Sequence, residues 1–311
     1  MKQNLVRNML TLLALLLVSA KGFAQFDPQF TQYMFNELFI NPAYAGSRAH
    51  LSGTGLLREQ WVGLDGAPST QSLTVHAPFA NHKMGAGLSV MHETIGVGKR
   101  LGVNAVGAYR IPMDRNTLSF GLQLGLVSLS ENLTDLNLIT DNQFQLNTGN
   151  KTAPNFGFGM YYQTPNWYAG ISIPRMLKNR LDVTNAETQV QNSLAASDFH
   201  YFVTAGSVHP ITPTIKLRPS VMLKAVSGAP MQLDMSCNAL FNDFIWAGLG
   251  YRTGDALSLL VGAQITKQLR LGYAYDYTTS DLQDFNSGSH ELMLGFDFGF
   301  DKDKIVTPRY F

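Results

Sequence analysis

The chain has 311 residues, and its 23 basic and 22 acidic side chains leave a net charge of +1 at pH 7. This balance gives no basis for nucleic-acid binding. Charged residues make up only 14% of the chain, against roughly 25% in soluble domains, and a single cysteine, Cys237, excludes an internal disulfide. Low charge with 28 glycines and 11% aromatic residues suits a membrane barrel, although it also suits an apolar soluble sandwich.

The amino terminus has the pattern of a secretory signal. Lys2 and Arg7 precede an apolar run over 9–18, and small residues follow at 22–24. We therefore expect a signal peptide over residues 1–24. No later stretch approaches the about 20 apolar residues of a spanning helix, which excludes a helical membrane protein.

Residues 25–48 do not alternate like a strand. Tyr33, Met34 and Leu38 have rough helical spacing, and Pro42 ends any helix because the residue before a proline avoids the α region. We expect a short helix and a turn inside a barrel or across its periplasmic mouth. A disordered leader is the alternative, which is disfavoured because many exposed aromatic rings would cost solubility.

From residue 49 onward the chain breaks into segments of alternating apolar and polar residues, bounded by turn residues. Side chains alternate faces along a strand, so each segment predicts a strand with one apolar face. An even number of strands is typical of single-chain bacterial barrels. The fourteen predicted strands cover residues 49–58, 69–78, 83–92, 99–111, 115–127, 153–163, 166–173, 199–208, 213–226, 231–241, 244–252, 256–265, 267–277 and 289–300.

The connections sort by length. Short ones follow the even-numbered strands, at 79–82, 112–114, 164–165, 209–212, 242–243 and 266. The long ones follow odd-numbered strands, at 59–68, 93–98, 128–152, 174–198 and 278–288, although 227–230 and 253–255 are short. Outer-membrane barrels have short periplasmic turns and longer external loops, whereas a soluble sandwich has no reason to sort its loops in this way.

The last hairpin carries the clearest facial pattern. One face of its two arms is wholly apolar, with Leu269, Leu271, Tyr273, Tyr275 and Tyr277 in the first arm and Leu292, Leu294, Phe296, Phe298 and Phe300 in the second. The opposite face carries glycine, alanine and isolated charges. A strand between lipid and a polar lumen has this pattern. Gly295, Phe298 and Phe300 also resemble the closing signal of outer-membrane barrels.

These patterns predict an all-β fold, a transmembrane antiparallel β-barrel of about fourteen strands over 49–300, with residues 25–48 inside the lumen and a periplasmic tail over 301–311. The predicted lumen face is rich in Gly, Ala, Ser, Asn and Gln rather than in rings of charge. That composition argues against an ion-selective porin. Small residues would also let an inner segment approach the wall closely.

The sequence predicts no enzyme, cofactor or metal site. The segment 96–100 lacks the first glycine and the Ser or Thr of a phosphate loop. The seven histidines show no zinc-ligand spacing, and no serine lies in a nucleophile elbow. A hydrolase at the rim of the lumen is the enzyme alternative, and it has the least support.

Two stretches are unusual enough to be partner-docking candidates. The first contains Asn41, Pro42, Tyr44 and Gly46, and the second, in the first external loop, contains Arg58, Trp61 and Gly63. Arginine and tryptophan are favoured at binding hot spots. Turn chemistry and interfacial anchoring by tryptophan explain the same residues, and physical reasoning alone favours that simpler interpretation.

These residues resemble motifs of the PorP/SprF family of Bacteroidetes outer-membrane proteins. The resemblance rests on Asp27-Pro28-Gln29-Phe30, Asn41-Pro42-Ala43-Tyr44-Ala45-Gly46, Arg58-Glu59-Gln60-Trp61-Val62-Gly63, Gly66-Ala67-Pro68-Ser69-Thr70 and the ending Thr307-Pro308-Arg309-Tyr310-Phe311. It adds Arg309 and Phe311 to the docking candidates. It extends over the chain from the expected cleavage point to the end.

The resemblance implies a cell outer-membrane component of type IX secretion that helps export or hold a large adhesin-like cargo and is often tied to gliding motility. The implied partners are this cargo, periplasmic or lipoprotein components of the machinery, and outer-membrane lipid. The alternative is an outer-membrane transporter for small apolar solutes. That function would need an apolar pocket between residues 25–48 and the wall.

Overall fold

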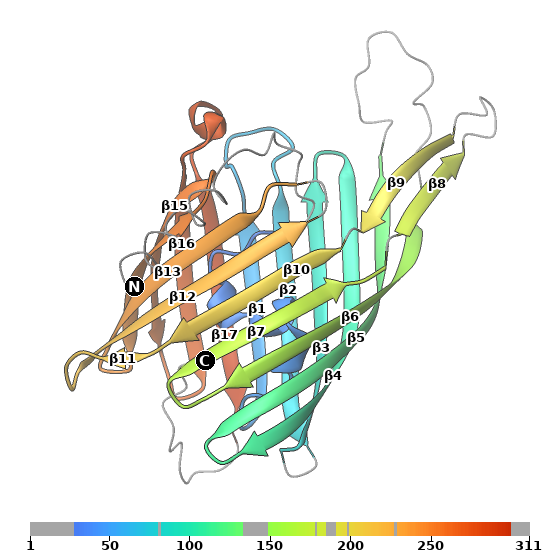
Figure 1. Ribbon diagram of the computed structural model, residues 1–311. Coiled ribbons are helices and arrows are strands. Elements are labelled where there is room, and N and C mark those ends of the chain that lie inside the picture. Colours follow the sequence, from blue (N-terminus) through green and yellow to red (C-terminus); the bar gives the residue numbers. More distant parts are fainter. Residues whose placement is uncertain are drawn as a thin grey trace, which may run out of the picture.

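The computed structural model describes residues 28–79, 82–132, 149–177, 179–184, 191–197, 199–226 and 229–299. Its main sheet curls into a closed antiparallel β-barrel (Figure 1). The strands of the ring are β1 (Leu51–Glu59), β2 (Ser69–Phe79), β3 (Met84–Ile95), β4 (Gly98–Met113), β5 (Asn116–Glu131), β6 (Lys151–Gln163), β7 (Trp167–Arg175), β10 (His200–Ser207), β12 (Ile215–Val226), β13 (Gln232–Phe241), β14 (Ile245–Arg252), β15 (Ala256–Gln264), β16 (Leu269–Thr278) and β17 (Ser289–Phe298). Each of the fourteen predicted strands overlaps one of them, so the predicted fold class is confirmed.

Two pairings complete the ring. β1 pairs with β17 over nine residue pairs, and β10 pairs with β12 over seven. The two-residue strand β11 (His209–Pro210) extends the sheet beside β12. Each ring strand therefore has a neighbour on both sides, which satisfies backbone N–H and C=O groups where no water is present.

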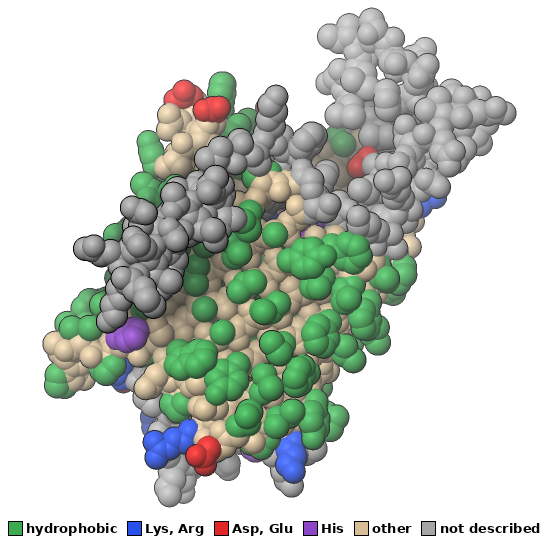
Figure 2. Space-filling view, viewed as in Figure 1, with side chains coloured by type: hydrophobic (Ala, Val, Ile, Leu, Met, Phe, Trp, Pro, Cys, Tyr) green, Lys and Arg blue, Asp and Glu red, His purple; other side chains and the backbone are tan. Residues whose placement is uncertain are grey.

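The side chains sort by face as predicted. In β16, Leu271 and Tyr277 are exposed, whereas Arg270, Ala274 and Asp276 are buried. The same alternation runs through the other strands, and hydrophobic side chains cover the outer wall between the two ends of the barrel (Figure 2). An apolar band around a polar interior is what a bilayer selects.

The two ends of the barrel differ in their connections. One end, here called the long-loop end, carries the connection 60–68 and the connection 279–288 with its 3₁₀ helix η5 (Asp281–Phe285). The other, the short-turn end, carries tight turns such as 114–115 and 164–166. These connections agree with the prediction that short turns follow even-numbered strands and long loops follow odd-numbered ones. In outer-membrane barrels the short turns face the periplasm.

Two predicted loops are wrong in detail. The predicted loop 93–98 is only a turn at 96–97, because β3 continues to Ile95 and β4 starts at Gly98; Gly96 supplies the positive φ of +54° that this turn needs. The predicted loop 174–198 contains a hairpin of β8 (Asn179–Thr184) and β9 (Gln191–Ser197), which extends beyond the rim (Figure 1). In both places strand pairing continues beyond the predicted strand ends. The sequence prediction placed these strand ends too early.

Residues 28–48, here called the inner segment, lie within the ring and not outside it. They form η1 (Tyr33–Phe35), the single-turn helix α2 (Glu37–Ile40) and η2 (Pro42–Tyr44). The predicted helix is thus broken into three short turns, and the alternative of a disordered leader is wrong for these residues. No helix in the described ranges is long and apolar enough to cross a membrane. The expected signal peptide, residues 25–27 and the expected tail 301–311 lie outside the described residues.

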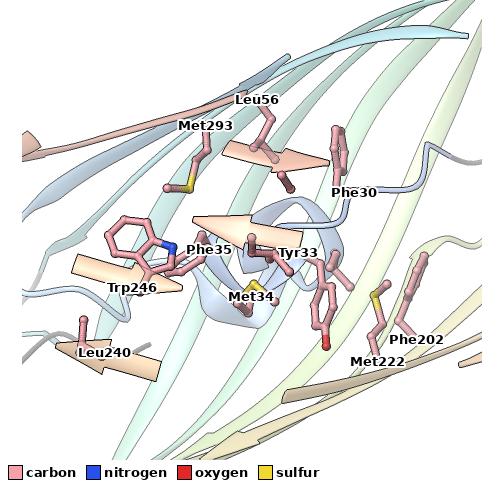
Figure 3. Packing of buried hydrophobic residues seen from close by; sticks show 13 residues of the cluster. Phe30, Tyr33, Met34, Phe35, Leu56, Phe202, Met222, Leu240, Trp246 and Met293 are labelled. Atoms are coloured by element: carbon pink, nitrogen blue, oxygen red, sulfur yellow. The ribbon is translucent and has the colours of Figure 1, made fainter. Parts of the chain in front are cut away.

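Apolar side chains of the inner segment build a core in the lumen (Figure 3). Phe35 packs against Trp246 of β14, with ring centroids 5.2 Å apart. Leu56 of β1 and Met293 of β17 come from neighbouring strands, while Phe202 of β10 comes from another part of the wall. Fully burying such a side chain contributes about 1.5–3 kcal/mol, so the inner segment is packed like the core of a soluble domain.

Glycines in the wall let the inner segment approach it. A Cβ atom on Gly85 would overlap the carbonyl oxygen of Ala45, and one on Gly121 would overlap the backbone nitrogen of Ala43. Since both glycines face the lumen, the space they leave is filled by backbone of the inner segment. The prediction that small lumen residues allow close approach is confirmed at these positions.

We predict that Gly121→Leu displaces the inner segment while the barrel still assembles, because the new side chain would occupy the space of Ala43 and overpacking costs about 1–3 kcal/mol or more. Limited proteolysis of the detergent-folded protein, with cut sites mapped by mass spectrometry, should show new cleavage within 28–48. Gly107→Leu is the matched control, since nothing lies within 4 Å of its Cβ position. Equal protease resistance of the two variants would contradict the prediction.

Candidate functional site

Five buried charged side chains meet at the long-loop end of the lumen, and they are Arg58, Asp234, Arg252, Asp276 and Glu291. We call them the long-loop cluster. Arg58 Nη2 lies 2.7 Å from Asp276 Oδ2, and Arg58 Nη1 lies 3.3 Å from Glu291 Oε2. Arg252 Nε lies 3.0 Å from Asp234 Oδ1, and Arg252 Nη1 lies 3.5 Å from Asp276 Oδ2. The cluster therefore joins β1, β13, β14, β16 and β17.

This cluster holds the start of the inner segment. The backbone N–H groups of Thr31 and Gln32 donate to the two carboxylate oxygens of Glu291, each at 2.8 Å. The Thr31 hydroxyl donates to Asp276 at 2.7 Å and accepts from Arg58 at 3.0 Å. Hydrogen bonds to charged groups are roughly twice as strong as neutral ones. The cluster is thus the strongest polar attachment described between the inner segment and the wall.

Asn41 attaches the middle of the inner segment. Its Oδ1 accepts from the Ala43 N–H at 2.9 Å, which caps η2, and its Nδ2 donates to the Met160 carbonyl at 3.0 Å. A Cβ on Gly159 of β6 would overlap the Asn41 amide oxygen. Pro42 starts η2, where its missing N–H costs nothing. The Asn-Pro pair is therefore explained by turn formation and by packing against glycine.

Gly46 brings the chain out of the lumen at the short-turn end. It has a φ of +71°, and its Cβ position lies 2.7 Å from the Gly85 Cα, so no other residue fits without strain. Its N–H donates to His76 Nδ1 at 3.0 Å, and its carbonyl accepts from Arg110. Just before it, the Tyr44 ring meets the His76 ring edge-on at 5.2 Å.

One acid of the inner segment sits deep in the lumen. Burial raises the pKa of the Glu37 carboxyl to about 7, while hydrogen bonds from Tyr168 and Thr204 act in the opposite direction. The Thr204 hydroxyl lies 3.5 Å from Glu37 Oε2. Burial thus favours the neutral form of the Glu37 carboxyl, which lowers the cost of placing it beside apolar side chains.

The predicted docking residues fall into three places. The structure brings five of them together at or beside the buried inner segment, namely Asn41, Pro42, Tyr44, Gly46 and Arg58. Trp61 and Gly63 lie apart on the long-loop rim, where the Trp61 N–H donates to Ser289 at 3.1 Å. Arg309 and Phe311 lie outside the described residues. A docking role for any of the nine candidates stays a prediction. Within the chain, the five buried residues help to hold the inner segment.

The lumen carries more charge than the sequence analysis expects. Asp276 and Glu291 are recognisable in sequence only as isolated charges on the polar face of the last hairpin. The structure adds Arg252 and Asp234 from β14 and β13 and pairs all of them. Charged residues at lumen-facing positions near strand ends are the signal that points to such a cluster. Across the described ranges, no three His, Cys, Asp or Glu side chains meet in a group suited to a metal ion.

We predict that Arg58→Met lowers the free energy of unfolding by about 3–5 kcal/mol, because it leaves two buried carboxylates without this partner. Urea unfolding of the folded barrel in detergent, followed by tryptophan fluorescence, measures this change. Lys216→Met is the control, since its 2.7 Å ion pair with Asp243 is less buried, with side chains that are 19% and 50% exposed, and pairs near the surface contribute about 1 kcal/mol or less. Equal losses in the two variants would rule out a special role for the cluster.

Comparison with known proteins adds the family. The model of the type IX secretion system membrane protein PorP/SprF matches residues 22–296, and no curated protein matches the chain. Similar solved structures include a Pseudomonas aeruginosa FadL homologue (12% identity, 88% of this chain and 95% of that one, TM-score 0.47). Another is the Ralstonia pickettii toluene transporter TbuX (10% identity, 83% of this chain and 92% of that one, TM-score 0.48). A third is the Acinetobacter baumannii outer membrane protein Omp33 (11% identity, 80% of this chain and 98% of that one, TM-score 0.45).

At these identities and TM-scores, the likeness to solved structures carries no argument about function. The family match is different, because it spans residues 22–296 and so almost the whole barrel. The closed ring of strands with an apolar outer band agrees with it and locates the protein in the cell outer membrane. The chain belongs to the PorP/SprF family of type IX secretion system membrane proteins.

Proposed function

We propose that this barrel assists the export or surface attachment of a large adhesin-like cargo, by binding proteins at both of its ends. Family membership makes the chain an outer-membrane component of type IX secretion. The proposed role is non-enzymatic and uses no cofactor. Gliding motility follows in cells whose cargo is a motility adhesin.

The filled lumen is the observation that supports a binding role over a conducting one. The cavity between the inner segment and the wall has a volume of about 40 Å³. That space suits about one or a few water molecules, whereas even a single helix is about 10 Å across. Because the inner segment occupies the lumen, we assign the protein contacts of this chain to its rims, its outer wall or its tail.

The two rims offer different surfaces. The long-loop end presents Trp61, which is a favoured hot-spot residue type, and the exposed helix η5. It is the end that faces outward in outer-membrane barrels, so we assign cargo contact to it. The short turns and the tail 301–311, with its Lys302, Lys304 and Arg309, are assigned to periplasmic or lipoprotein components of the machinery.

Transport of small apolar solutes is the second candidate. It needs a pocket beside the inner segment, and ligand sites occupy about 300–1,000 Å³. The cavity of about 40 Å³ is far smaller and is lined by polar side chains such as Gln29, Gln232 and Asp234 as well as by apolar ones such as Phe30 and Met222. Its small size favours the secretion role.

We predict that deleting the gene removes one or a few large proteins from the cell surface, because their export or attachment needs this barrel. Quantitative proteomics of the surface and periplasmic fractions, with the parent strain and a complemented strain as controls, measures the loss. An unchanged surface proteome together with reduced uptake of an apolar solute would reject the secretion role and favour transport.

We predict that deleting residues 301–311 leaves the barrel folded and abolishes co-purification of periplasmic partners, because the amphiphilic tail is assigned to contact them. Slower migration of the heated sample than of the unheated one on electrophoresis checks folding. Trp61→Ala at the opposite rim is the control and should retain those partners. Co-purification that survives the tail deletion would show that the tail is not their contact.

A further inference from the structure

A second group of buried charges lies in the lumen at the short-turn end. It consists of Arg48, three residues before β1, Arg270, at the start of β16, and Asp297, near the end of β17. We call it the short-turn cluster. Arg270 interacts electrostatically with both Arg48 and Asp297, and a third cation, Arg218, lies close by over the ring of Phe35 at 5.0 Å.

The two clusters are built differently. In the long-loop cluster, two guanidinium groups face three carboxylates at distances between 2.7 and 3.5 Å. In the short-turn cluster, Asp297 is the carboxylate described beside Arg48 and Arg270, and Arg48 Nη1 is 3.9 Å from its Oδ2. The other oxygen of Asp297 accepts from the Ser52 hydroxyl at 2.6 Å. The short-turn cluster therefore has an excess of positive charge.

Arg270 carries this inference. Its side chain is 5% exposed, and in the described part of the chain its Nε atom has no hydrogen-bond partner. The guanidinium lies over Gly295, with Nε 3.1 Å from the position a Cβ would take. The Nη1 atom of Arg48 likewise has no hydrogen-bond partner among the described residues. Buried charges are normally paired and hydrogen-bonded because an unpaired one is costly.

The position and chemistry of the cluster indicate which ligand would complete it. Arg270 follows the turn 265–268, at the end that faces the periplasm in outer-membrane barrels. A planar guanidinium matches the oxygen pairs of carboxylates and phosphates. Exposed Lys83, Arg115 and Lys267 lie on turns of this end. Basic side chains are visible at this lower end in Figure 2, together with acidic ones.

We propose that the short-turn cluster is an oxyanion-binding site, in which Arg270 and Arg48 hold a carboxylate or phosphate group that enters from the periplasm. Two sources have this chemistry, namely an acidic peptide segment and free phosphate. The inference deepens the proposed function, because an acidic segment would belong to a periplasmic partner. Binding by the purified barrel does not depend on cargo export, so either idea can fail without the other.

The test uses the full mature chain folded in zwitterionic detergent, with hexaglutamate and inorganic phosphate as separate probes and chloride at matched ionic strength as the reference. Isothermal titration calorimetry measures binding to the parent protein, Arg270→Met and Lys267→Met. We expect Arg270→Met to weaken probe binding by roughly tenfold or more, and Lys267→Met, which changes only a rim charge, to weaken it less than about threefold.

Each outcome decides the matter. Binding of hexaglutamate that depends on Arg270 supports the site with a peptide as its source, and binding of phosphate alone supports it with free phosphate as its source. If neither probe distinguishes the parent protein from Arg270→Met, the site does not exist.

Thermal stability without a probe is the second readout. Arg270 shares the single described carboxylate of Asp297 with Arg48, so its buried charge is only partly compensated. Replacing such a charge with an apolar side chain of similar length removes a desolvation cost. We therefore expect Arg270→Met to raise the Tm of the empty barrel, opposite in sign to the effect of Arg58→Met. If Tm falls instead, Arg270 is already paired in the empty protein and the proposal is overturned.

Discussion

The need to satisfy every backbone hydrogen bond in lipid governs this structure. A sheet edge has no water to bond in hydrocarbon, so β1 must pair with β17 and the ring must close. Closing fourteen strands creates a lumen that side chains from the wall alone do not fill. The inner segment occupies that space with three short helical turns.

Two physical effects fix the inner segment. Apolar side chains such as Phe35 and Met34 pack as a core against the wall, which supplies attraction but little direction. The orientation of the segment comes from contacts that fit only one arrangement. Glu291 accepts hydrogen bonds from two backbone N–H groups. Asn41 packs against Gly159, and Gly46 packs against Gly85. Together they place the start of the segment at the long-loop end and its exit at the short-turn end.

This arrangement separates the barrel into parts with different tasks. The inner segment occupies the lumen, and the outer wall is a surface for lipid; in the function proposed above, the rims bind proteins. The two charged clusters also differ. The long-loop cluster is paired and holds structure together, while in the short-turn cluster the buried Nε of Arg270 has no hydrogen-bond partner among the described residues. A paired cluster stabilises the fold, whereas an incomplete one is suited to binding a ligand.

The sequence by itself determined the number of strands, their apolar faces and the presence of a non-strand segment before them, because a period of two and helical spacing are local properties. It also showed that Pro42 and Gly46 mark turns. It did not show that β3 and β4 meet in a two-residue turn. The sequence predicted a loop over 93–98, whereas the structure continues β3 to Ile95. Only the tertiary structure decided which lumen charges meet. Thr31 and Glu291 are 260 residues apart, and alternation reports the face of a side chain but not the register that closure imposes.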